Sequence, residues 1–419
     1  MPATLNTTLR MTRKHVSPPG HWSWRIPVTH RHGTRHDRLM FVGGQSDLDA
    51  AGNVNNPGDL LRQADACMKH VRAVVESLDG RMEDVAKLNV FHTGATLADE
   101  DELLRRIRAH VAGDIPPVIS LVRVPRLSYP GMAVVIDAVA IDNADGTMPR
   151  RASTPANHWR FPKGGEFSQG LRCGELLFVS AQSARDAKGA TLHPGDIGSQ
   201  AQDTIDNIAR VLEGMGADLD DVVKLNTWFV GFGTDEDWRR AARVRSEAFR
   251  YPGPGATGVP VPEPYPDGAL IRQDCWAMRG VDGRVLPRSL SWPKGHWDWP
   301  MRVTFQQGVK VGNLVFLGGQ YACDVKGLAQ KPGEREAQTR ITMDFIRDIL
   351  AGFGATMDDL VMTKCFYLGD GTPESLHANL AIRSSYFSDP AAATTNVALK
   401  TMGLEGLMLE IEGIAVLDR

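Results

Sequence analysis

Two acidic residues late in the sequence, Glu410 and Glu412, have the type and spacing that acid–base chemistry requires. They lie in the apolar run Leu409–Ala415, and side chains two residues apart on a strand share a face. A carboxyl group lining a cleft can hold a raised pKa and act as a general acid or base, which typically contributes roughly 10²–10⁴ in rate. The alternative is a pair of exposed carboxylates on a strand. Glu410 is the first catalytic candidate.

The second catalytic candidate is His30, which opens the histidine- and arginine-rich segment His30–His36. Imidazole can act as acid, base or metal ligand near neutral pH. His30 and His32 also have the spacing of neighbours on one face of a strand and could chelate a metal. A solvated basic hairpin would carry the same composition. We place His30 in a pocket and expect neither a metal site nor a cofactor.

The elements that position these residues occur three times in the sequence. Gln45, Gln182 and Gln320 each close a short apolar run, and they lie 137 and then 138 residues apart. Four other sets recur at the same offsets: His21-Trp22, His158-Trp159 and His296-Trp297; Gly52, Gly189 and Gly327; Gln63, Gln200 and Gln338; and Arg108, Arg245 and Arg383. A period this long indicates three tandem copies of one whole domain, because the units of a solenoid are far shorter.

The second copy shows the order of elements most clearly. Residues 176–182 predict a buried strand, and Asp196 is placed to cap a helix with apolar residues at three- and four-residue steps up to Gly214. Alternation over 222–229 predicts a second strand, followed by a helix near 237–250. A Pro/Gly loop and a last strand around 269–277 complete the copy. Each copy therefore predicts a sheet covered by two helices.

We place the three domains at residues 21–141, 157–280 and 295–419, with linkers at 142–156 and 281–294. The linkers carry Pro, Arg and Ser with weak periodicity. The recurring His-Trp after each linker is more typical of a packing anchor than of a ligand site.

The overall composition narrows the functions that the chain can have. Its 47 basic and 50 acidic residues give a formal charge of -3, which argues against nucleic acid as a partner. Five cysteines at unrelated positions suggest a reducing compartment rather than a disulfide framework. No apolar stretch reaches the length of a membrane span, and residues 1–20 lack the apolar core of a secretion signal. We therefore expect a cytoplasmic protein with no membrane partner.

Each copy resembles the RidA/YjgF family of small enamine and imine deaminases. The resemblance lies in the apolar strand ending at Gln, the Asp-x-x-Gly turn, the Gly-terminated helix, the strand starts at Asp221 and Asp359, and the final segment Leu409–Ala415. It implies an α+β (α/β-layer) fold of three RidA-like domains, each a mixed β-sheet with two helices on one face. Family members look like homotrimers, so the chain would form an intramolecular pseudo-trimer with three small-molecule clefts. Further assembly into a higher oligomer is also possible.

The resemblance also suggests residues that bind the substrate. Family members grip a carboxylate with an arginine in a Pro-Ala-Arg-(Ser/Thr) loop, and none of the three corresponding segments contains Arg. Glu410 matches the family's water-orienting glutamate, and Arg272 takes its place in the second copy. The candidates for substrate binding are Arg272, Thr395, Thr257, Arg108, Arg245, Arg383, Phe167 and Phe305. For the three helical arginines, the alternative is pairing with acidic neighbours or lying along the surface.

Two functions follow from these residues. The first is a hydrolase of deaminase or amidohydrolase type, which acts on a C–N bond of a small nitrogenous metabolite with a carboxylate-activated water. It is motivated by Glu410. The second is a pseudo-trimer that binds a small molecule or serves as a structural unit without catalysis, motivated by the three missing arginines. Ribonuclease activity, claimed for some relatives, fits the charge least.

Overall fold

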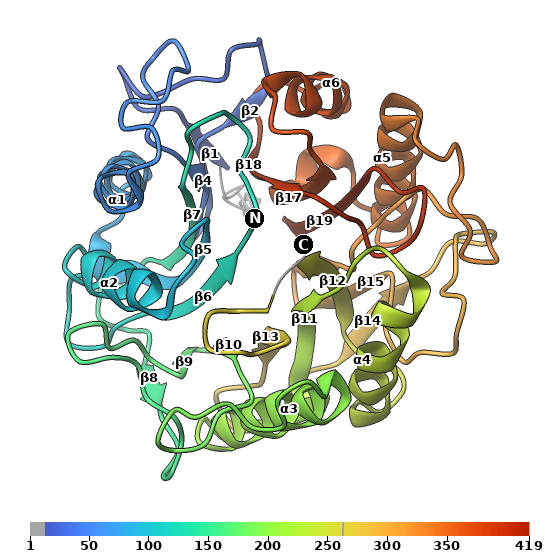
Figure 1. The fold of residues 1–419 in the computed structure, drawn as a ribbon. Helices are drawn as coiled ribbons and strands as arrows, with labels where there is room; N and C mark the ends of the chain where they lie inside the picture. Colours follow the sequence, from blue (N-terminus) through green and yellow to red (C-terminus); the bar gives the residue numbers. More distant parts are fainter. Residues whose placement is uncertain (1–12, 262–263, 419) are drawn as a thin grey trace, which may run out of the picture.

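The three copies form three similar α+β units around a common axis (Figure 1). The computed structural model describes residues 13–261 and 264–418, so the first twelve of the N-terminal residues discussed above lie outside the described part. The strands face inward and the six helices lie on the outside. This arrangement confirms the predicted pseudo-trimer. Among the described residues, no helix is both long and apolar enough to cross a membrane.

Repeat 1 supplies a mixed sheet in the order β1-β3-β4-β7-β5-β6, in which only β5 and β6 run parallel. Its elements are β1 (Lys14–Val16), β2 (His30–Arg31), β3 (Gly33–His36), β4 (Leu39–Gln45), α1 (Leu60–Ser77), β5 (Val85–His92), α2 (Leu97–Arg108), β6 (Val118–Arg123) and β7 (Val134–Ile141). The short strand β2 leaves this sheet and joins the sheet of repeat 3.

Repeat 2 repeats this plan in the order β12-β11-β13-β10-β9-β8. Its elements are β8 (Arg150–Ser153), β9 (Gly170–Cys173), β10 (Leu176–Gln182), α3 (Ile197–Glu213), β11 (Val222–Val230), α4 (Asp235–Ala248), β12 (Gly255–Val261) and β13 (Ile271–Met278). The predicted strand at 176–182 and the Asp196 cap are both present, since the Asp196 side chain accepts from the amides of Gly198 and Ser199.

Repeat 3 has the order β14-β15-β16-β19-β17-β18-β2. Its elements are β14 (Arg288–Ser291), β15 (Gly308–Val311), β16 (Leu314–Leu317), α5 (Arg335–Ala351), β17 (Leu360–Leu368), α6 (Pro373–Ser384), β18 (Ala391–Leu399) and β19 (Leu409–Val416).

Two differences from the predicted elements concern segments rich in Pro and Gly. Most of the predicted loop at 252–258 is strand β12, which pairs in parallel with β11. Each connector also contains a short strand, β8 or β14, which pairs with the sheet of the following repeat. Pairing with a neighbouring strand supplies the backbone hydrogen bonds of these segments, although their local sequence does not predict a strand.

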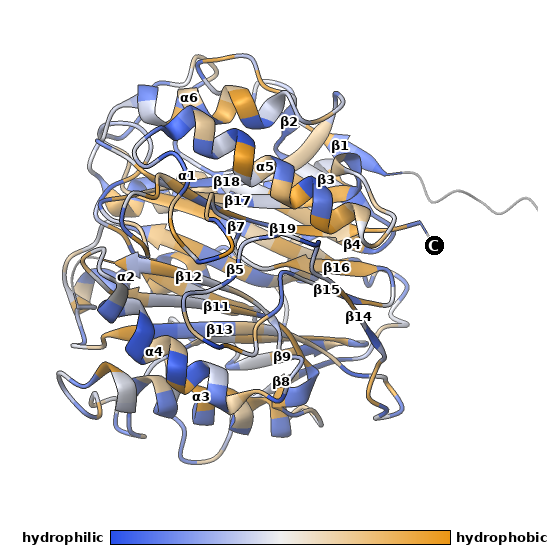
Figure 2. Cartoon of the chain, turned by 90° about the vertical axis from the view of Figure 1, so that its right-hand side faces the viewer, coloured by the Kyte–Doolittle hydropathy of each residue, from blue (hydrophilic) through white to orange (hydrophobic). Residues whose placement is uncertain are grey.

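The core has two parts, one outside and one inside the three sheets. The outer part lies between each sheet and its helices, for example where α1 and α2 cover repeat 1. The inner part joins all three repeats through the equivalent residues Phe41, Phe178 and Phe316. Figure 2 shows the sheets stacked between helices at opposite ends of the view. This inner core requires all three sheets to be present, so the repeats are parts of one folded body.

Three seams join the repeats. At each one, the edge strand of one repeat meets the segment before the first long strand of the next. Val118 bridges to Ser168 and Gly255 bridges to Gln306. At the third seam Ala391 pairs with His30, which closes the ring between repeats 3 and 1. The seams therefore have equivalent geometry but different side chains.

Candidate functional site

One strand position and one helix position recur at each seam, and we call the space where a seam brings them together a cleft. The first cleft lies between repeats 1 and 2, the second between repeats 2 and 3, and the third between repeats 3 and 1. The strand position holds Arg272, Glu410 and Val135 in the first, second and third clefts. The helix position holds Arg108, Arg245 and Arg383 in the same order. The clefts therefore differ in charge.

In the second cleft, Glu410 is a buried carboxyl group. Its side chain is only 4 % exposed, so it is not the exposed strand carboxylate that was the alternative. Burial raises the pKa of Glu410 to about 8, although Lys224 and Arg245 act in the opposite direction. The carboxyl group lies against Gly319, where an added Cβ would come 1.7 Å from its Oε1. The group is therefore largely protonated at neutral pH, and a side chain at residue 319 would displace it from its present position.

Arg245 reaches the same cleft from helix α4 of repeat 2. It is 1 % exposed, which excludes the surface role considered for it. Its Nη1 donates to Thr227 Oγ1 at 2.8 Å, its Nε donates to the carbonyl of Ala241 at 3.2 Å, and its guanidinium carbon lies 5.5 Å from the ring centre of Phe305. Burial lowers the pKa of Arg245 to about 10, against the attraction of Glu410. It remains a cation at neutral pH.

Glu410 and Arg245 converge on one backbone segment of strand β12. The Gly258 amide donates a hydrogen bond to Glu410, and a Cβ on that glycine would lie 3.7 Å from Arg245 Nη2. The second cleft thus combines a protonated carboxyl group and a guanidinium with an aromatic ring. These are the groups needed to bind an anionic substrate and move one proton.

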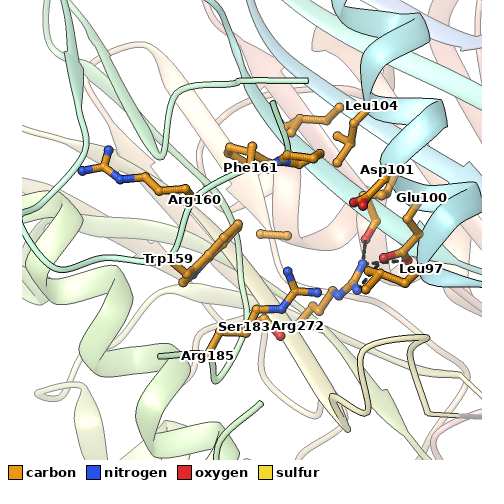
Figure 3. Close-up of a pocket in the computed structure, with 14 residues that line it drawn as sticks. Leu97, Glu100, Asp101, Leu104, Trp159, Arg160, Phe161, Ser183, Arg185 and Arg272 are labelled. Atoms are coloured by element: carbon orange, nitrogen blue, oxygen red, sulfur yellow. Dashed lines mark hydrogen bonds and ion pairs between the residues drawn. The ribbon is translucent and has the colours of Figure 1, made fainter. Parts of the chain in front are cut away.

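The first cleft has the opposite charge arrangement. Its strand residue Arg272 forms two hydrogen bonds to Glu100 of helix α2, at 2.9 and 3.0 Å (Figure 3). It also forms an ion pair with Asp267 at 3.4 Å. The ring of Tyr265 lies 3.9 Å from its guanidinium carbon. Arg272 lines the cavity at this seam, and both of its terminal nitrogens already donate to these carboxylates and to the Leu121 carbonyl.

The third cleft contains His30 and Arg383. His30 is buried, so the solvated basic hairpin is wrong for this residue. Its Nδ1 lies 2.9 Å from the Ala392 carbonyl, and burial together with Arg383 lowers the pKa of His30 to about 3. Arg383 is fully buried and donates to Asn379, Thr394 and Asn396. His30 is therefore neutral at physiological pH and belongs to a different cleft from Glu410.

The remaining predicted residues fall into different places. Arg108 occupies the equivalent helix position but does not line the cavity of the first cleft; it is half-buried and donates to the Val111 carbonyl at 3.1 Å. Phe167 packs in the core with the helices of repeat 1, and Phe305 lies beside Arg245. In the described part of the chain, no group of three or more His, Cys, Asp or Glu side chains is placed to hold a metal ion.

Thr257 and Thr395 face the centre of the molecule, where they bond to a ring of charged residues that was not predicted. Three ion pairs cross the three seams. They join Lys87 to Asp274 at 3.0 Å, Lys224 to Glu412 at 2.8 Å and Lys364 to Asp137 at 3.3 Å. Thr257 accepts from Lys224 Nζ at 2.5 Å, and Thr395 donates to Asp137 at 3.0 Å. All three pairs are buried.

The signal for this ring was present in the sequence but irregular. Lys87 and Lys224 occupy equivalent positions, two residues before Asn89 and Asn226. Repeat 3 has Met362 at the lysine position and Lys364 at the asparagine position. Because residues two apart on a strand share a face, the shifted lysine still reaches the axis.

Repeat 1 also differs near the His-Trp segment. His32 Nε2 lies 2.9 Å from the Trp22 carbonyl, and the equivalent glutamines of repeats 2 and 3 donate to the corresponding tryptophan carbonyls. Rings of His21 and His32 lie 4.4 Å apart, and those of His21 and His70 lie 4.6 Å apart. Burial lowers the pKa of His21 to about 4 and that of His32 to about 3.

Comparison with known proteins agrees with the threefold repeat. The Endoribonuclease L-PSP family model matches residues 27–142, 160–270 and 300–417. A RutC family protein of Pyrococcus abyssi is 31 % identical over 115 residues, which are 27 % of this chain and 87 % of the relative. A 2-iminobutanoate/2-iminopropanoate deaminase of Dermatophagoides farinae is 30 % identical over 99 residues, 24 % of this chain and 75 % of that protein.

A similar structure extends over most of the chain. The crystal structure of a chorismatase matches with a TM-score of 0.53 and 13 % identity, covering 80 % of this chain and 93 % of that one. This similarity concerns the fold.

Proposed function

The chain belongs to the Endoribonuclease L-PSP family, identified above by its resemblance to RidA/YjgF proteins, and from this premise we propose that it is a hydrolase acting on a C–N bond in the second cleft. The observation that carries the proposal is the buried Glu410, with its pKa raised to about 8, beside the buried Arg245. A carboxyl group that titrates near the working pH suits proton transfer. The substrate is a small imine or related nitrogen compound with an anionic group.

The reaction follows from the protonation state of Glu410. The protonated carboxyl group gives its proton to the substrate nitrogen, which makes the attached carbon a better electrophile. The resulting carboxylate accepts a proton from the attacking water as the new C–O bond forms. Glu410 donates again to the nitrogen of the tetrahedral intermediate. The C–N bond breaks as the hydroxyl oxygen forms the carbonyl group, the hydroxyl proton returns to Glu410, and the nitrogen leaves as ammonia or an amine. The products are a carbonyl compound and the released nitrogen base.

Arg245 supplies the cation that the family's loop arginine provides elsewhere. Ala256 occupies the loop position in the second cleft, so a guanidinium from the neighbouring helix takes over the anionic end of the substrate. A hydrogen bond to a charged group is worth roughly 1.5–3 kcal/mol. The similar deaminase, named for two 2-imino acids, supports a carboxylate-bearing imine as the first substrate class to examine.

The alternative is a binding protein without catalysis, and one experiment separates the two functions. Purified protein is offered 2-imino acids, imines without a carboxylate and small amides, and the release of ammonia or amine is measured. We expect turnover that Glu410→Gln abolishes without lowering the melting temperature at neutral pH. Turnover unaffected by Glu410→Gln would refute the assignment, and ligands that raise the melting temperature but are returned unchanged would favour the binding protein.

A further inference from the structure

The first cleft contains two buried polar groups that have no partner. They are the indole N–H of Trp159 and the hydroxyl of Ser183, whose side chains are 5 % and 3 % exposed. Both residues line the same cavity, which spans about 480 Å³ including its open mouth. Buried hydrogen-bonding groups are almost always satisfied, so two orphans in one cavity indicate an absent partner molecule.

The other repeats show what Trp159 would do in a purely structural role. Trp22 donates its indole N–H to Gln45 Oε1 at 3.1 Å, and Trp297 donates to Gln320 Oε1 at 3.0 Å. The equivalent Gln182 accepts from His158 at 2.8 Å, but Trp159 does not donate to it. Of the three equivalent tryptophans, Trp159 of repeat 2 is therefore the one that does not bond to its glutamine, and Trp159 lines this cavity.

The walls of the cavity define the shape and charge of the missing partner. Trp159 and Phe161 stand on one side, and helix α2 with Glu100 and Asp101 stands opposite (Figure 3). The two rings lie 5.0 Å apart in a T-shaped arrangement, and Leu104 extends the apolar surface. This surface fits a flat, largely apolar molecule.

The charged groups of the first cleft neutralise one another. Arg272 is bound by Glu100 and Asp267, and Arg185 pairs with Asp267 as well. Within these ion pairs two guanidinium groups face two carboxylates, and Asp101 and Arg160 add one charge of each sign to the lining. An ionic ligand that binds at the buried groups would have to displace one of these pairs and leave a buried charge unpaired, which is costly. A neutral ligand leaves all of them in place.

We propose that the first cleft is a second ligand site, which binds a small neutral planar molecule. A carbonyl oxygen of this molecule accepts from the Trp159 N–H, and one of its N–H groups donates to the Ser183 hydroxyl oxygen. Aromatic amides and lactams have this chemistry. The site is independent of Glu410 and does not depend on the function proposed for the second cleft.

Benzamide, benzoate and benzylamine test the proposal, because they share a ring and differ in charge. We expect benzamide to bind the full-length protein in isothermal titration at millimolar concentration, more tightly than the two ions. Trp159→Phe keeps the ring but removes the donor, and it should weaken benzamide binding by roughly tenfold, as should Ser183→Ala. The matched control Trp297→Phe removes an indole that is already satisfied and should leave benzamide binding unchanged.

The melting temperature provides a second readout. Trp159→Phe removes an unsatisfied donor and should not lower the melting temperature, whereas Trp297→Phe loses a hydrogen bond and should lower it. The proposal is overturned if benzamide does not bind, if benzoate or benzylamine binds more tightly, or if Trp159→Phe leaves benzamide binding intact. It is also overturned if Trp159→Phe destabilises the protein as much as Trp297→Phe does, because the indole would then have a structural partner.

Discussion

Replacing Glu410 by Gln should change how the stability of the protein depends on pH. In the unfolded chain the carboxyl group ionises near its ordinary pKa of 4.5, whereas in the folded protein burial raises the pKa to about 8. Between these values the unfolded state loses its proton first, so the wild type loses stability as the pH rises. Each pH unit in this window corresponds to about 1.4 kcal/mol. Gln cannot ionise, so the unfolding free energy of the variant should exceed that of the wild type by up to about 5 kcal/mol at the upper end of this window.

The assay is urea unfolding of wild type and Glu410→Gln at several pH values from 5 to 9. The difference in unfolding free energy should rise up to about pH 8 and then level off. Glu412→Gln is the matched control, because the pairs with Lys224 and Lys364 lower the pKa of Glu412 despite its burial. Its unfolding free energy should be lower than that of the wild type by an amount that stays constant from pH 5 to 9, because the lowered folded pKa and the unfolded pKa both lie below this range. A flat difference for Glu410→Gln would refute the buried, protonated carboxyl group.

Three further predictions follow from the described contacts. Gly319→Ala should displace the Glu410 carboxyl group and abolish turnover. The loss of stability should be small, because the added methyl group collides with the movable end of a side chain. A steady-state assay that shows equal turnover would contradict this prediction. Lys87→Met should cost about 3–5 kcal/mol in chemical unfolding because it leaves Asp274 buried without its cation, and adding Asp274→Asn should restore much of the loss. Burial lowers the folded pKa of His32, so the wild type loses stability as the pH falls from 6.5 towards 3. His32→Gln should lessen this loss, because Gln cannot take up a proton. An unchanged acid-unfolding curve would count against this reasoning.

The repeated fold could be predicted from the sequence because its signals are local and occur three times. The strand ending at Gln182 and the helix capped by Asp196 each depend on residues close together in the chain. Strand β12 was missed because Gly255 and Pro260 disfavour a strand. Its parallel pairing with β11, which lies about thirty residues earlier, decides its conformation.

The site was predictable in part, for the same reason. The position of Glu410 followed from the repeat, whereas its neighbour Arg245 comes from another domain and could only be one of three equivalent arginines in the sequence. The pairing of Arg272 with Glu100 joins residues 172 positions apart. No local pattern indicates that this arginine is already neutralised. Contacts across the seams, rather than residue types, distinguish the three clefts.

The ring of ion pairs has a consequence for the chemical reactivity of the protein. Lys87, Lys224 and Lys364 are buried, and each is paired with a carboxylate of the neighbouring repeat. An amine-acylating reagent dissolved in water reaches them only while the sheets are apart, whereas exposed lysines react at once. Peptide mass spectrometry of the acylated protein over time would therefore report how often the closed ring opens under native conditions.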